Sequence, residues 1–112
     1  MLKSQTITNE EWSADPEDWL HNPHAGEMLR LEFMEPLGLT ANALATSIQV
    51  APDQLESMLE GRSRVDADLD LRLGRYFGMS DGFFLRLQDS YELMEAKRKL
   101  SGELDRINPR AA

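Results

Sequence analysis

Apolar residues recur at helical spacing along most of the chain beyond residue 22. The first such stretch places them three and four positions apart, at Met28, Leu29, Leu31 and Phe33. This period is typical of one face of an α-helix and predicts a helix that begins near Pro23. The same helix should end before Pro36, because a proline disfavours the helical conformation of the residue that precedes it.

Two shorter helical patterns follow. Thr40 is a good N-cap for a helix over residues 41–48, since its side-chain oxygen can accept a hydrogen bond from the first turn. Pro52 suits the first position of the next helix, and Gly61 suits the position after its end. The expected inward faces are Leu44, Ala45 and Ile48 in the first of these helices and Leu55, Met58 and Leu59 in the second.

Two longer patterns complete the chain. Asp66 is a good N-cap for a helix that Gly78 would end, with an apolar face formed by Leu69, Leu73 and Phe77. Ser80 is the expected N-cap of a last helix that reaches Leu100, with an apolar face formed by Phe84, Leu87, Tyr91 and Met94. No segment shows convincing alternation with the period of two that is typical of strands. The sequence therefore predicts an all-α fold with five helices.

The pattern also divides the chain into three parts. Residues 1–22 lack sustained periodicity and form an acidic, flexible N-terminal arm, whereas the predicted helices occupy residues 23–100 and residues 101–112 form a C-terminal tail. A length of 112 residues corresponds to one domain.

The connection between the second and third predicted helices is only three residues long, Gln49, Val50 and Ala51. A helix-turn-helix unit joins two helices at a steep angle through a turn of about three or four residues. Ala45 is small enough to let the two helices approach, while Val50 would fill the turn and Leu55 would anchor the second helix. An ordinary helical hairpin fits the spacing equally well, so both interpretations stand on spacing alone.

Three further stretches carry recognisable motifs: HNPHAGEMLRLEFMEPLGLTANALA, LEGRSRVDADLDLRLGRYFGMS and FFLRLQDSYEL. Together, from about Pro23 to Leu93, they resemble the HigA/VapI group of antitoxins, which are helix-turn-helix proteins of the Xre/Cro type. The resemblance implies a dimeric five-helix, lambda-repressor-like domain that binds operator DNA, represses its own operon and neutralises a basic RelE-like ribonuclease toxin. The alternatives are a protein-interaction module that has lost operator binding and a stand-alone repressor without a toxin.

Contacts with double-stranded operator DNA are expected from the start of the second helix and from the third helix and its exit. In the third helix, Gln54 could pair with adenine and Asp53 could accept from cytosine N4, while Arg62 and Arg64 could hold phosphate. The full expected set is Thr40, Asn42, Asp53, Gln54, Ser57, Arg62 and Arg64.

The expected DNA-binding face also departs from the family pattern. Ala41 stands where the family often has glutamine, and Gln49 stands where a turn glycine is common, so Gln49 should adopt a positive φ. Glu56 and Glu60 replace the usual serine and asparagine. Because carboxylates repel phosphate, we expect DNA binding that is weaker or more selective than the family norm.

Charge and aromatic residues indicate two further partner surfaces. Of the net charge of −8, most lies in residues 1–35, which hold two basic and eight acidic residues. Trp12 and Trp19 lie among these acidic residues and are the expected toxin contacts, the alternative being a solvated leader. In the last helix we expect homodimer contacts across a two-fold axis, unless this apolar face is used entirely inside the protomer. The expected dimer residues are Phe84, Leu87, Tyr91 and Met94.

Other classes of site find little support. The chain has no cysteine, and Asn22-Pro23 interrupts the spacing between its two histidines, His21 and His24, so no metal site or other cofactor is expected. The stretch DADLD (residues 66–70) lacks the glycine of a calcium loop and is better explained by N-capping and a solvated helix face. No nucleophile–base pair is visible, so an enzyme is not expected. Without an apolar segment of membrane-spanning length, the expected location is the cytoplasm.

Overall fold

The computed structural model describes residues 22–111, and within this range every regular element is a helix. The all-α prediction is therefore confirmed, and the expected five helices are present. The first is built from three consecutive segments, α3, η2 and α4. The elements are α3 (Ala25–Met28), η2 (Leu29–Met34), α4 (Glu35–Leu37), α5 (Ala41–Ile48), α6 (Pro52–Leu59), α7 (Ala67–Phe77), α8 (Phe83–Lys99) and the short 3₁₀ turn η3 (Leu104–Arg106).

The first helix continues through Pro36, so the predicted end before this proline is wrong. Its middle segment, η2, is a π-helix, in which the Glu35 N–H donates to the Arg30 carbonyl five residues earlier. This wider turn accommodates a proline, which has no N–H to donate and whose ring would crowd an α-helix. The helix ends after Leu37, where Gly38 adopts a left-handed φ of 66°.

The π-helix also changes which side chains face the core. Leu29 and Met34, five residues apart, are both buried, whereas Leu31 is 48% exposed. A π-turn contains more residues than the 3.6 per turn of an α-helix, so it rotates the side chains that follow it. The predicted pairing of Met28 with Leu31 on an inward face is therefore wrong.

The ends of the next three helices follow the local capping residues. The side-chain oxygen of Thr40 accepts from the Ala43 N–H, and that of Asp66 accepts from the Leu69 N–H. Gly78 ends α7 in the left-handed conformation. These predicted caps are confirmed.

The N-terminus of α8 is capped by a residue from another helix. The carboxylate of Asp70, on α7, accepts hydrogen bonds from the backbone N–H groups of Gly82 at 2.7 Å, Phe84 at 2.8 Å and Leu85 at 3.1 Å. A negative charge at a helix N-terminus is favourable because it faces unpaired N–H groups. The helix begins after Gly82, so the predicted cap, Ser80, is wrong, and Asp70 is 1% exposed rather than part of a solvated face.

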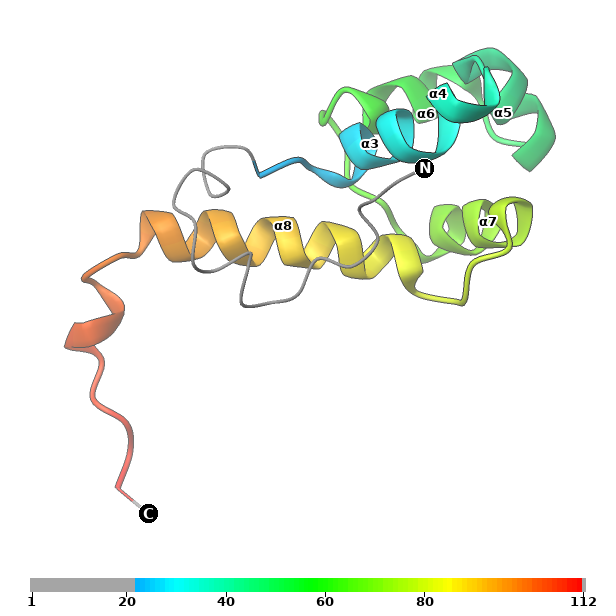
Figure 1. Ribbon diagram of the computed structural model, residues 1–112. Coiled ribbons are helices and arrows are strands. Elements are labelled where there is room, and N and C mark those ends of the chain that lie inside the picture. The colour runs from blue at the N-terminus through cyan, green and yellow to red at the C-terminus, as the bar shows by residue number, and fades with distance from the viewer. Residues whose placement is uncertain (1–21, 112) are drawn as a thin grey trace.

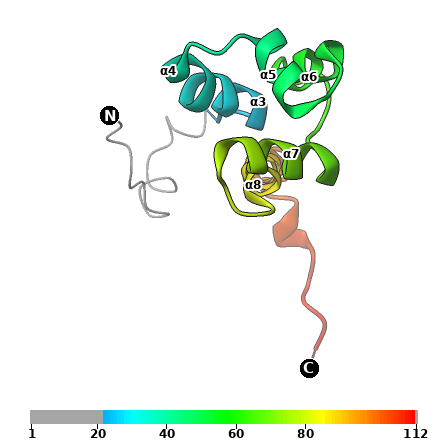
Figure 2. The same cartoon turned by 90° about the vertical axis from the view of Figure 1, so that its right-hand side faces the viewer.

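The helices form two layers around one core (Figures 1 and 2). One layer contains the first helix, α5 and α6, and the other contains α7 and the long α8. The polar residue Gln88 contributes to the join between them: its side chain accepts from the Val65 N–H and donates to the Val65 carbonyl at 2.9 Å. The buried apolar residues are Ala25, Leu29, Met34, Leu44, Ala45, Ile48, Leu55, Met58, Leu59, Val65, Leu69, Leu73 and Phe84.

Beyond α8 the chain leaves the body of the domain. Residues 100–111 are exposed and extend away from the helices, with η3 as their one regular turn (Figure 1). None of the helices in the described range combines the length and apolar character that crossing a membrane requires.

Candidate nucleic-acid interface

The turn between α5 and α6 has the three residues that the sequence predicted. Gln49 adopts the left-handed conformation with φ 64° and ψ 47°, which confirms the expected positive φ. The N–H of Val50 donates to the Ala45 carbonyl at 3.0 Å and closes the turn over the end of α5. Ala51 is extended, and Pro52 then begins α6.

The two helices are fixed by contacts within the pair and from the first helix. Ala45 and Leu55 are fully buried, and Val50 packs against the core cluster. A Cβ at position 26 would lie 2.1 Å from the Met58 carbonyl oxygen, so only glycine permits this approach of α3 to α6. The recognition helix of the motif, α6, therefore has a defined position relative to the domain body.

Exposed polar groups lie at the N-terminal ends of both helices of the pair. Thr40 and Asn42 are exposed at the start of α5. Asp53 and Gln54 are exposed in the first turn of α6, where nothing in the described part of the chain covers them. Ser57, one turn later, is half-buried and therefore less accessible than the other four predicted residues.

The two arginines expected to hold phosphate are both engaged by carboxylates. Arg62 forms an ion pair with Glu60. Arg64 donates to both carboxylate oxygens of Glu92 on α8, at 2.7 Å and 3.0 Å. This hydrogen bonding raises the pKa of the Arg64 guanidinium and lowers the pKa of the Glu92 carboxyl. Both arginines are exposed, so phosphate can reach them, but it would have to compete with a carboxylate already in place.

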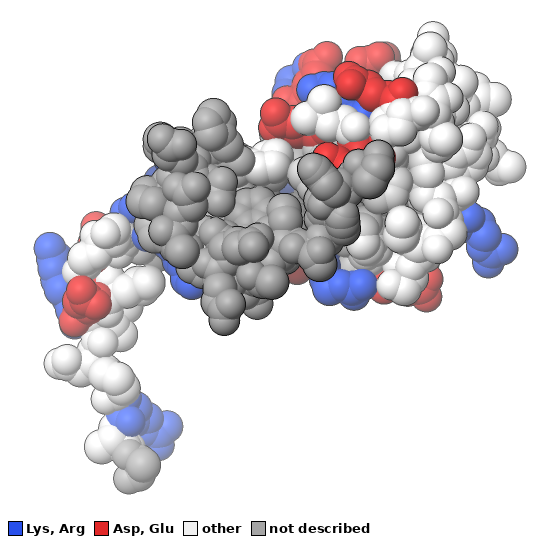
Figure 3. Space-filling view, viewed as in Figure 1, with Lys and Arg blue, Asp and Glu red and all other residues white. Residues whose placement is uncertain are grey.

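No cation is added by α5, whose sequence contains no charged residue. On the face shown in Figure 3, the surface over α5 is correspondingly free of charged side chains. The candidate interface thus presents neutral polar side chains, the carboxylate of Asp53 and two arginines that are already paired.

The structure changes the set of residues available for a dimer. Phe84 is 0% exposed and packs in the protomer core, so it has no surface left for a partner, and its assignment to a dimer contact is corrected. Leu87, Tyr91 and Met94 are half-buried. Leu93, which was not part of the predicted apolar face of α8, is 63% exposed.

The remaining predicted residues divide between two outcomes. Trp12, Trp19 and His21 lie outside the described residues. The ring nitrogen Nδ1 of His24 accepts from the Gly26 and Glu27 N–H groups, so this histidine is the N-cap of α3. Among residues 22–111, no three histidine, cysteine or acidic side chains are grouped as metal ligands would be.

Three residues with long-range roles were not recognised as such from the sequence. They are Asp70, Glu92 and Arg72, whose guanidinium contacts the carbonyls at the end of α5. For Asp70 the sequence held an indication, because it lies three residues before Leu73 and therefore on the buried side of α7. The partners of Glu92 and Arg72 lie 28 and 24 residues away, beyond any helical spacing.

Comparisons with known proteins agree with this geometry. No family model matches the chain. Virulence-associated protein I of Dichelobacter nodosus is 39% identical over 75 residues, which cover 67% of this chain and 69% of the relative. Antitoxin HigA-1 of Vibrio cholerae is 29% identical over 84 residues, covering 75% of this chain and 79% of the relative.

Solved structures extend the likeness to the fold. The Pseudomonas aeruginosa antitoxin HigA, solved with the higBA promoter, is 31% identical and superposes with a TM-score of 0.73 over 80% of this chain and 99% of that one. These proteins are named as antitoxins and virulence-associated proteins rather than enzymes, and the chain is a non-enzymatic protein of the helix-turn-helix type. It belongs to the HigA/VapI family of antitoxins.

Proposed function

We propose that the protein is an antitoxin that binds operator DNA in its own promoter as a homodimer and neutralises a basic RelE-like ribonuclease toxin. The observation that carries the DNA-binding part is the exposed first turn of α6, held behind a three-residue turn in a fold shared with a HigA solved on promoter DNA. Acting on DNA places the protein in the cytoplasm.

The base-reading residues are Asp53 and Gln54. Both are exposed in the first turn of α6, the part of a recognition helix that reaches base edges in the major groove. Gln54 can bond adenine at N6 and N7, and Asp53 can accept from cytosine N4. Thr40, Asn42 and Ser57 supply further polar contacts at the edges of this surface.

The side chains of Arg62 and Arg64 contact the phosphates of the DNA backbone. To do so, each arginine exchanges its carboxylate partner for a phosphate. Exposed ion pairs contribute little, about 0–1 kcal/mol, so this exchange is feasible. The exchange nevertheless leaves the carboxylates of Glu60 and Glu92 near the DNA without their arginine partners. The result is DNA binding with modest non-specific affinity and strong dependence on the base contacts.

The test is a titration of promoter DNA followed by fluorescence anisotropy. The expected site is an inverted repeat with half-sites about 10 bp apart, because a two-fold dimer presents two recognition helices one helical turn apart. Gln54→Ala should relax the sequence preference, whereas Arg62→Ala should weaken all sequences alike. If the promoter shows no saturable binding at low salt, the DNA-binding half of the proposal fails.

The dimer would form through α8. Leu87, Tyr91 and Met94 are half-buried, with Leu87 against the protomer core and the Tyr91 ring against His24, so they offer a partner only their exposed part. Leu93, on the exposed side of the helix, adds apolar surface. Sedimentation at micromolar concentration should give a mass near twice 12.7 kDa, and Leu93→Lys should shift it toward the monomer. A monomer at all concentrations would contradict this part.

One observation favours a second function, an interaction module that has kept the fold but not operator binding. The two exit arginines are both paired and α5 carries no charge. In that case the protein would still bind its protein partner while the promoter titration stayed flat.

A further inference from the structure

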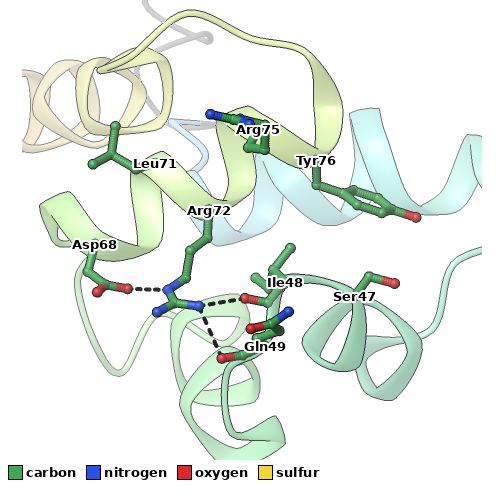
Figure 4. A pocket seen from close by; sticks show the side chains of 8 residues that line it. All are labelled: Ser47, Ile48, Gln49, Asp68, Leu71, Arg72, Arg75 and Tyr76. Carbon is green, nitrogen blue, oxygen red and sulfur yellow. Dashed lines mark hydrogen bonds and ion pairs between the residues drawn. The ribbon is translucent and has the colours of Figure 1, made fainter.

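One arginine of α7 contacts the backbone of the helix-turn-helix pair. The Nη1 of Arg72 donates to the Ile48 carbonyl at 2.9 Å and to the Gln49 carbonyl at 3.2 Å (Figure 4). The Nε of the same guanidinium donates to the carboxylate of Asp68, one turn earlier on α7. The side chain therefore links α7 to the point where the chain leaves α5.

These two carbonyls belong to the part of the turn that sets the direction of α6. The last carbonyls of a helix have no N–H partner within the helix and carry the negative end of its dipole, so a cation is favourable there. Gln49 is the non-glycine residue with a positive φ in the described range. A left-handed conformation costs a residue with a side chain about 1–2 kcal/mol. The Arg72 guanidinium binds the carbonyls of Ile48 and Gln49, and it therefore opposes relaxation of Gln49 out of the left-handed conformation.

A neighbouring arginine lacks this contact. Arg72 lines a surface groove together with Leu71 and Tyr76, and Arg75, one turn further along α7, lines this groove too. It is exposed, and within residues 22–111 it forms neither an ion pair nor a side-chain hydrogen bond. In Figure 4 its side chain points away from the turn. The two arginines thus carry equal charge on one helix but differ in contact with the turn.

We propose that Arg72 is a positioning residue for operator recognition. By holding the Ile48 and Gln49 carbonyls, it fixes the turn in the conformation that aims the first turn of α6 at the bases. The inference rests on the proposed DNA-binding function. Arg72 acts through the backbone that it binds, not through a contact with base or phosphate.

Loss of this contact should therefore affect sequence discrimination. With Arg72→Gln, the ratio of operator to scrambled-DNA affinity should fall roughly tenfold, the size expected when one good base contact is misaligned. The slope of log K against log salt should stay the same, because the number of phosphate contacts is unchanged. Arg72→Lys, which keeps the charge but lacks the planar fork, should lose part of the discrimination.

The experiment compares wild type, Arg72→Gln, Arg72→Lys and the matched control Arg75→Gln in anisotropy titrations at several salt concentrations. Arg75→Gln should keep the wild-type ratio. Two results would overturn the proposal: an unchanged ratio in Arg72→Gln, or equal weakening on both DNAs with a salt slope smaller by about 0.9, the signature of a lost phosphate contact.

A second measurement on the free protein separates this inference from the proposed function. The Gln49 and Val50 N–H groups bond to carbonyls of α5 at 3.2 Å and 3.0 Å, so their hydrogen exchange reports opening of the turn. In Arg72→Gln their exchange should accelerate at least about tenfold while amides of α8 keep their protection. Unchanged exchange at the turn refutes the positioning role. Faster exchange in a protein that never binds the promoter refutes the DNA-binding proposal instead.

Discussion

Asp70 is a buried carboxylate that replaces a local cap for the longest helix. It accepts from three backbone N–H groups and is 1% exposed. Removing a charged acceptor leaves buried donors unsatisfied, which is among the few mechanisms by which a single substitution strongly destabilises a domain.

We predict that Asp70→Asn lowers the free energy of unfolding by about 2–4 kcal/mol. The amide has one acceptor oxygen and brings an NH₂ group toward N–H donors, so it cannot replace the carboxylate. Urea unfolding measures the change. Asp68→Asn, on an exposed position of the same helix, is the control and should change the stability by about 0.5 kcal/mol or less. A small effect at Asp70 would mean that water can take over its role.

Gln49 combines a side chain with a left-handed backbone. We predict that Gln49→Gly stabilises the protein by about 0.5–1 kcal/mol, because glycine adopts positive φ without the steric penalty. The reciprocal control is Gly78→Ala: the residue has φ 73° and nothing within 4 Å of an added Cβ, so only backbone strain should lower its stability. Thermal unfolding of both variants gives the signs. A destabilised Gln49→Gly would show that the Gln49 side chain contributes more than its strain costs.

At the scale of elements, helix ends set by local residues were predictable and those set by distant residues were not. Thr40 and Asp66 cap from the adjacent position, where the sequence pattern can identify them. The start of α8 depends on Asp70, twelve residues earlier, and the passage through Pro36 depends on a π-helical segment. Neither a contact between two helices nor a π-helical turn can be recognised from a pattern with the α-helical period.

The candidate interface divides in the same way. Asp53 and Gln54 were predicted to face outward under the helix-turn-helix interpretation, and both are exposed in the first turn of a helix with a recognisable start. The pairing of Arg64 with Glu92, 28 residues apart, could not be predicted, because it depends on how the loop after α6 packs beside α8. Whether an arginine on an exposed face is neutralised by a carboxylate thus depends on how the helices and loops pack.

This pairing leads to a prediction about DNA affinity. Glu92→Gln removes the carboxylate that Arg64 must leave to reach a phosphate, so promoter binding should strengthen several-fold at low salt, because the exchange no longer costs an ion pair. Asp89→Asn makes the same change in net charge near Arg64 without touching the bidentate pair and serves as the control. Equal effects of the two substitutions would mean that net charge alone, not release of Arg64, controls affinity.

At the scale of the whole molecule, charge is distributed unevenly along the chain. Residues 1–35 hold eight of the twenty acidic residues and two of the twelve basic ones. The interface proposed for DNA lies in a part of the chain that is closer to neutral. A single domain can therefore present different electrostatic surfaces to an anionic nucleic acid and to a basic protein.

The acidic arm is the proposed site of toxin capture. Trp12 and Trp19, which lie outside the described residues, have acidic neighbours at Glu11, Asp15 and Asp18. Aromatic side chains are common anchors of protein interfaces, and complementary charge at the rim speeds association with a basic partner. A ribonuclease is expected to be basic because it binds RNA. The arm and the helix-turn-helix surface would then serve two partners independently.

We predict that deletion of residues 1–20 severely weakens capture of the proposed ribonuclease toxin, while thermal stability and promoter binding stay the same. Trp12→Ala with Trp19→Ala should mainly raise the dissociation rate, because buried aromatic anchors control residence time. Glu11→Gln with Asp15→Asn should mainly lower the association rate and its salt dependence. Surface plasmon resonance at several salt concentrations separates the two effects. If the truncated chain neutralises the toxin as well as the full chain does, toxin capture belongs to the helical domain and the arm is a solvated leader.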